Sequence, residues 1–116
     1  MKKENRVYRM YLEDILIAMD HIAEYIHSYS FDEFKKDYKT VDAVIRNFEI
    51  IGEASKNLPV EIKEKYSELP WTEMYSLRNK VSHEYFGIDY EIIWDVASNY
   101  LPLNKSQIEE ILLKEE

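Results

Sequence analysis

Apolar side chains recur at helical spacing from about Asn5 to Ser28 and predict a long first helix. They return every three or four positions and form one broad stripe, which is typical of an amphipathic helix that packs on a core. The stripe consists of Tyr8, Tyr11, Leu12, Ile15, Ala18, Met19, Ile22 and Ile26. Leu16 and Ile17 widen it, so we expect this helix to contact more than one neighbour.

Few residues in the chain would interrupt helices. The 116 residues include two Gly and three Pro, which are the residues that weaken or end helices. No stretch alternates apolar and polar residues between turn-forming residues, as a strand would. We therefore predict an all-α protein, an up-and-down antiparallel bundle of four to five main helices, built as a single domain over residues 1–116.

Capping residues and prolines predict where the next helices begin and end. Ser30 and Glu33 have the spacing of a capping box and predict the start of a short helix. Thr40 is the expected N-cap of the second long helix, which ends near Asn57. Residues 59–67 then predict a short helix with proline in its first turn.

The second half of the chain predicts three further helices. One begins at about Trp71, and Asp89 is the expected N-cap of the next, Tyr90–Leu101. Pro102 is expected to end that helix, and Asn104 to open the last one. The residues of Tyr90–Leu101 that we expect to face the core are Ile92, Ile93, Val96, Ala97 and Tyr100.

Charge and cysteine content exclude several classes of protein. The net charge of −8 argues against a broad nucleic-acid-binding face, because affinity for nucleic acid depends on neutralising phosphates. An RNA site would therefore be local, around Arg78, Lys80 and either Arg46 or Lys56. The absence of cysteine excludes disulfides and thiolate metal sites, and we expect a cytoplasmic protein. No apolar run approaches the roughly 20 residues of a membrane span, and no signal peptide is recognised.

One cluster, in the segment Trp71–Asp89, combines residue types that suggest chemistry. Arg78 carries a planar set of donors that suits phosphate, and His83 can take and give a proton near neutral pH. Asn79 and Tyr85 complete the set. A phosphate-binding cation beside a proton shuttle is sufficient to cleave RNA without a metal, since the 2′-hydroxyl supplies the nucleophile. We expect neither a metal site nor a cofactor.

The five-residue spacing leaves two arrangements open. On one helix, Arg78 and His83 would lie about 140° apart rather than on one face. Either the helix ends near His83, as Gly87 suggests, or the two side chains find partners across an interface between two copies. We favour helix termination combined with a two-fold dimer.

The segment RNKVSHEY resembles the Arg-x4-His-x-Tyr motif of the HepT-like ribonuclease toxins in the HEPN superfamily. Asn79 matches the polar residue that HEPN nucleases often carry after the arginine. RNFEIIGEASKNLP, residues 46–59, is similar to the second long helix of that family. The resemblance extends from about residue 5 to residue 112, with no departure at the motif positions.

The resemblance implies a function and a set of partners. The chain would be a metal-independent endoribonuclease toxin of a HepT/MntA-type toxin–antitoxin module, in which Arg78, His83 and Asn79 cleave RNA. A nucleotidyltransferase antitoxin would neutralise it by transferring AMP to Tyr85. Lys80 and Arg46 are candidates for further RNA contacts, and a homodimer is expected. The alternative is a non-catalytic helical dimer that binds a nucleotidyltransferase partner.

Other polar residues have simpler interpretations. Glu49 and Glu53 are spaced as an acid pair, but a solvated helix face explains them better than half of a metal site. Gly52 indicates either close approach of another helix backbone or space for substrate near Glu53. His21 and His27 lack companions at metal-ligand spacing and are expected to be partly exposed.

Overall fold

The computed structural model describes residues 3–83 and 89–115, and the side chains of residues 7–77 and 89–115. Most of the described residues are helical and none of them belongs to a strand, so the all-α prediction is confirmed. No helix among them is long and apolar enough to cross a bilayer. The elements are α1 (Lys3–Ile26), α2 (Phe31–Lys36), α3 (Tyr38–Asn57), α4 (Val60–Lys65), α5 (Trp71–His83), α6 (Tyr90–Asp95), the π-helix η1 (Val96–Tyr100) and α7 (Leu101–Lys114).

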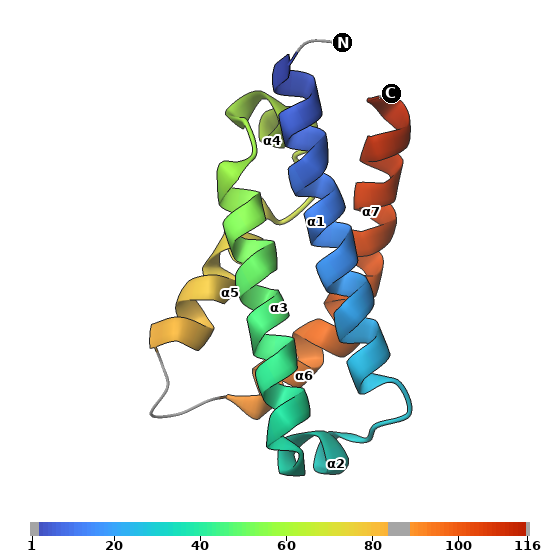
Figure 1. Cartoon of the computed structure of the whole chain (residues 1–116), viewed down its shortest axis with the longest axis vertical. Helices are drawn as coiled ribbons and strands as arrows, with labels where there is room; N and C mark the ends of the chain where they lie inside the picture. The colour runs from blue at the N-terminus through green and yellow to red at the C-terminus, as the bar shows by residue number, and fades with distance from the viewer. Residues whose placement is uncertain (1–2, 84–88, 116) are drawn as a thin grey trace.

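The long helices form an up-and-down bundle, as predicted (Figure 1). α1 and α3 run antiparallel and pack along their lengths, α5 packs on α3, and α7 packs on α1. α2 closes one end of the bundle, where it contacts α3 and α6. This order leaves α5 supported by α3 along one side.

The core is built from the apolar stripes of α1 and α3. Most of the predicted α1 stripe is buried, and α3 adds Val41, Val44, Phe48 and Ile51, each at most 2% exposed. Ile17 was expected to widen the stripe, but it is 53% exposed, so that detail is wrong. The buried members of the α1 stripe are Tyr8, Leu12, Ile15, Ala18, Met19 and Ile22.

The capping box before α2 is confirmed, whereas the predicted cap of α3 is wrong. Ser30 N–H donates to Glu33 Oε1 at 2.9 Å, and Glu33 N–H donates to Ser30 Oγ at 3.1 Å. The N-cap of α3 is Asp37, whose Oδ1 accepts from Thr40 N–H at 3.2 Å. Hydrogen bonds from the Tyr29 hydroxyl and from Thr40 lower the pKa of Asp37. Because the Asp37 carboxylate accepts from the Thr40 N–H, α3 begins at Tyr38, earlier than a Thr40 cap would place its start.

The chain does not break at Pro102, which is a second correction. Leu101 N–H donates to Val96 O, and this wide turn carries the helix from α6 into α7. Pro102 lies in the first turn of α7, where a missing N–H is tolerated. Asn104 therefore caps no helix; it is buried within α7 and donates from Nδ2 to Gln107 Oε1 at 3.1 Å.

The burial of α6 and η1 also differs from the expectation in part. Ile93 and Ala97 are buried as predicted, and Val96 is half-buried. Ile92 and Tyr100 were expected to face the core, but they are 42% and 55% exposed. The predicted N-cap Asp89 is confirmed, since its Oδ1 accepts from Ile92 N–H at 3.1 Å.

Glu115 joins the end of α7 to two other parts of the bundle. Its Oε1 accepts from the Tyr8 hydroxyl of α1 at 2.9 Å, and its Oε2 accepts from Lys65 Nζ of α4 at 2.6 Å. The Tyr66 hydroxyl also donates to Oε2. These donors, led by Lys65 and Tyr66, lower the pKa of Glu115 to about 2.

Glu115→Gln is expected to lower the free energy of unfolding by about 1–3 kcal/mol at pH 7. Because the folded pKa of about 2 lies below the ordinary 4.5, this stabilisation is present above pH 4.5 and is lost as the pH falls towards 2. Urea unfolding at pH 7 and pH 3 measures the difference between the two proteins. It should be smaller at pH 3, and a difference that is equal at both pH values contradicts the role of the charge. Glu110→Gln, at an exposed carboxylate 3.9 Å from Lys114, is the matched control.

Candidate functional site

The first turns of α5 are fixed by burial and hydrogen bonds. Trp71 is buried, and its Nε1 donates to the Tyr66 carbonyl at 2.9 Å. Met74 and Leu77 on the same helix are buried too. The packing of this half of α5 sets the rotation of the helix, and with it the register of the residues that follow.

The motif occupies the second half of α5. The backbone of Arg78, Asn79, Lys80 and His83 belongs to the helix, which extends to His83. Their side chains, and the whole of Tyr85, lie outside the described residues. Because both motif positions lie on one helix, the backbone positions of Arg78 and His83 are about 140° apart around its axis. The expected helix stop at Gly87 also lies outside the described residues.

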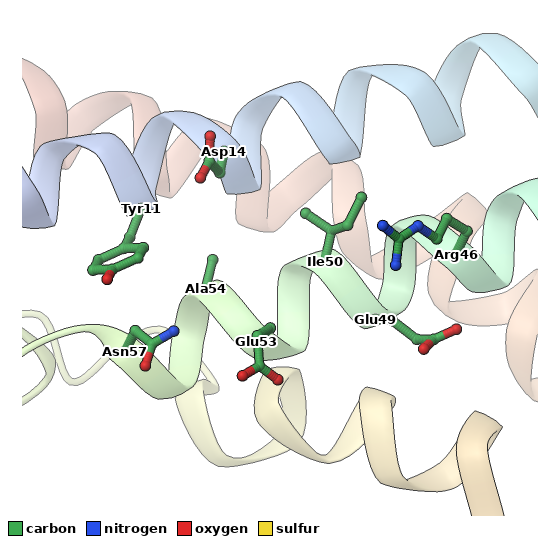
Figure 2. A pocket seen from close by; sticks show the side chains of 8 residues that line it. All are labelled: Tyr11, Asp14, Arg46, Glu49, Ile50, Glu53, Ala54 and Asn57. Atoms are coloured by element: carbon green, nitrogen blue, oxygen red, sulfur yellow. The ribbon is translucent and has the colours of Figure 1, made fainter.

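α3 packs on α5 (Figure 1). The last turns of α5, which carry the motif positions, turn away from α3 in Figure 1. Arg46, one of the predicted RNA-contacting residues, lies on α3, and its side chain extends towards α1 (Figure 2). Arg46 is exposed.

A cavity of about 310 Å³ lies along α1 and α3 (Figure 2). Among the described residues of its lining, Arg46 is the single cation, and three carboxylates are present. This balance does not favour phosphate, so the cavity is not an anion site by itself. Its lining consists of Tyr11, Asp14, Arg46, Glu49, Ile50, Glu53, Ala54 and Asn57.

The acidic residues and Gly52 of α3 have structural surroundings. In Figure 2, Glu49 and Glu53 extend from α3 on the side towards α5, and Arg46 extends towards α1. In the part of the chain that the structure describes, no three His, Cys, Asp or Glu side chains are grouped to hold a metal ion. Gly52 is buried and does not line the cavity beside Glu53, which favours its role in helix packing.

A larger cavity, of about 600 Å³, lies between the first half of α5 and the α6–η1–α7 segment. We name it the α5–η1 cavity. Sequence reasoning missed it because Ile92 and Tyr100 were assigned to the core, whereas they form its wall. Its lining residues are Pro70, Thr72, Glu73, Met74, Ser76, Leu77, Ile92, Val96, Tyr100, Leu101 and Asn104. The ten tyrosines in the chain were the one sequence feature to suggest that some tyrosine side chains lie at the surface rather than in the core.

The two histidines outside the motif are solvent-exposed. The ring centroids of His21 and Tyr25 are 6.0 Å apart. His27 follows the end of α1. Both are exposed, as predicted. They provide matched controls for experiments on His83.

The sequence is similar to one known protein family and to several individual proteins. A family model described as Ribonuclease HepT-like matches residues 15–111. The chain is 51% identical over 104 residues to a Methanocaldococcus jannaschii protein named as a candidate RNase, a match that covers 90% of the chain and 86% of that protein.

Two further relatives are similar over most of their length. A Caldanaerobacter subterraneus subsp. tengcongensis protein, also named as a candidate RNase, is 46% identical over 107 residues, which cover 92% of the chain and 96% of that protein. A Thermococcus cleftensis protein named as a candidate ribonuclease HepT is 42% identical over 106 residues, which cover 91% of the chain and 96% of that protein. No solved structure gives a significant match.

Proposed function

Because this chain belongs to the HepT-like ribonuclease family, and is therefore an RNA endonuclease, we propose that it cleaves RNA without a metal ion through Arg78 and His83. The observation that carries the proposal is the placement of both residues on α5, a helix whose first half is anchored by Trp71, Met74 and Leu77. A buried anchor supports the rigid positioning that catalysis requires.

The proposed reaction is a transesterification. His83 takes the proton of the 2′-hydroxyl, whose oxygen attacks the neighbouring phosphorus, and the bond from phosphorus to the 5′-oxygen breaks. A proton then passes to the leaving 5′-oxygen. Arg78 holds the phosphate and stabilises the negative charge that grows on it, and Asn79 donates a hydrogen bond to the phosphate or orients His83. The products carry 2′,3′-cyclic phosphate and 5′-hydroxyl ends.

We propose that two copies of the chain build the active site. The separation of about 140° between Arg78 and His83 on α5 supports this, because one straight helix does not direct both side chains into one groove. A two-fold axis near the end of α5 would bring two sets of the motif together. One His83 would then act as the base while that of the second copy protonates the leaving oxygen.

Lys80 and Arg46 are proposed to hold the RNA on either side of the scissile phosphate. The exposure of Arg46 on α3, the helix that packs against α5, supports this role. The carboxylates beside Arg46 and the net charge of −8 limit the number of phosphates that the protein can neutralise. Binding should therefore depend on few phosphates and only modestly on salt.

We further propose that the enzyme is the toxin of a HepT/MntA-type toxin–antitoxin pair, and that a nucleotidyltransferase partner inactivates it by adding AMP to Tyr85. Tyr85 is two residues from His83 in the sequence. An AMP group attached there would bring negative charge and bulk to the place that the substrate phosphate occupies.

The test compares the protein purified alone with the protein co-expressed with its nucleotidyltransferase. In EDTA, the unmodified protein is expected to cleave RNA and leave 2′,3′-cyclic phosphate ends, whereas the co-expressed protein should carry AMP and lose activity. Co-expressed Tyr85→Phe should stay unmodified and active. AMP on another residue, seen by mass spectrometry, contradicts the assignment of Tyr85. No cleavage of several RNAs, including tRNA, by the unmodified protein contradicts the nuclease mechanism.

A further inference from the structure

The α5–η1 cavity shares its main helix with the proposed catalytic motif. Thr72, Glu73, Ser76 and Leu77 line it from α5, and Leu77 directly precedes Arg78 in the sequence. Positions 76 and 83 are two turns apart and lie on the same side of an α-helix. The side of α5 that borders the cavity therefore leads to the position of His83.

The far wall of the cavity comes from η1 and its neighbours. Ile92, Val96 and Tyr100 face α5 across it, and Tyr100 is 55% exposed. The apolar floor includes Met74 and Leu77, which are buried. A volume of about 600 Å³ lies in the range of clefts that enclose small organic ligands, and an accessible aromatic ring offers a surface for stacking.

The charges around the cavity favour a base over a phosphate. Among the residues whose side chains the structure describes, the lining contains no lysine or arginine, and Glu73 is its one charged side chain. Thr72, Ser76 and Asn104 add neutral polar groups. Among these described residues, a phosphate would meet a carboxylate without a compensating cation, whereas a base would find an apolar floor, an aromatic ring and hydrogen-bonding groups for its edge.

We propose that the α5–η1 cavity is a base-binding subsite that determines which RNA is cleaved. A nucleotide close to the scissile phosphate places its base in the cavity, where it stacks on Tyr100 and its edge meets Glu73. A carboxylate accepts hydrogen bonds but donates none, so it favours a base with an exocyclic amino group. Cytosine presents an amino group at the ring position where uracil presents a carbonyl oxygen, so the subsite prefers cytosine to uracil. This proposal rests on the proposed function, because the bound RNA is the substrate.

Binding is measured in the His83→Ala background, so that the RNA stays intact. The probes are fluorescent single-stranded oligo(C) and oligo(U) of about 12 nucleotides, followed by anisotropy. Tyr100→Ala is expected to raise the Kd for oligo(C) about 5–100-fold, and Tyr100→Phe should restore binding because the ring is retained. Tyr38→Ala, at a 71% exposed tyrosine on α3, is the matched control and should leave the Kd unchanged.

Glu73→Gln tests the base preference separately. The parent is expected to bind oligo(C) at least about 5-fold more tightly than oligo(U), and the variant, whose amide also donates, should reduce that ratio to about 2 or less. Glu61→Gln, at an exposed residue of α4, is the control.

Three results would overturn the subsite: equal affinity of the parent for both probes, unchanged binding by Tyr100→Ala, or a Tyr100→Ala effect on oligomeric state or nucleotidyltransferase binding alone. The last result would make the cavity a protein interface.

Cleavage by the protein with an intact His83 is recorded in parallel. If that protein cleaves no RNA but the binding results hold, the nuclease mechanism fails and the subsite stands. If it cleaves and the variants bind as the parent does, only the subsite fails.

Discussion

Replacing His83 with alanine is expected to lower the rate of RNA cleavage by about 10²–10⁴-fold, because general acid–base catalysis contributes that much. If two copies of His83 act as base and acid in one site, the loss falls at the upper end of this range. The assay uses unmodified protein in EDTA, with product ends identified by their 2′,3′-cyclic phosphates. Circular dichroism and unfolding measurements establish that the variant is folded.

The matched control for His83→Ala is His27→Ala, at an exposed histidine that follows α1. This variant should cleave RNA at the parent rate. Arg78→Ala is expected to lower the rate of RNA cleavage by about 10²–10³-fold. Arg78→Lys should recover only part of that rate, since an ammonium does not reproduce the bidentate contact of a guanidinium with phosphate. Retention of activity by both His83→Ala and Arg78→Ala would refute the proposed site and leave the non-catalytic dimer as the better account.

Replacing Phe34 with alanine is expected to lower the free energy of unfolding by about 3–5 kcal/mol. Phe34 is fully buried on α2, and its ring centroid lies 5.2 Å from that of Trp94 on α6. Alanine would remove the ring and leave a cavity between α2 and α6. A loss of this size is a large part of the stability of a domain of this length.

Urea unfolding at neutral pH measures the effect of Phe34→Ala. Phe31→Ala is the control, since Phe31 is half-buried and its ring centroid lies 6.3 Å from the same tryptophan ring. It should cost about 1 kcal/mol, as expected for a partly exposed aromatic pair. Equal losses for the two variants would mean that contact with Trp94, rather than burial of Phe34, provides the stabilisation.

Local sequence patterns predicted most of the helices because their causes are local. The apolar stripe of α1, the capping box at Ser30 and the N-cap Asp89 depend on residues a few positions apart, and each is confirmed. The cap of α3 was missed because two capping residues, Asp37 and Thr40, lie three positions apart, and the pattern does not show which of them starts the helix. Asp37, which also accepts from Tyr29, caps the helix in place of Thr40.

The α6–η1–α7 segment was not predictable from local rules. Pro102 normally ends a helix, but here a wider turn before it carries the chain onward. Whether Ile92 and Tyr100 face a core or a cavity depends on where α5 packs, and periodicity carries no information on that. The residue types of the motif suggested its chemistry, and the roles of Arg78, Asn79, His83 and Tyr85 stay predictions.

The wide turn at η1 has a consequence for how this chain can vary in length. Ile93 and Ala97 on one side of it, and Leu101 and Ile108 on the other, are all buried in the same bundle. Each residue gained or lost between them would rotate α7 by about 100° relative to α6. Insertions and deletions should therefore be excluded from this segment in proteins that keep the bundle, whereas a loop at the surface would tolerate them.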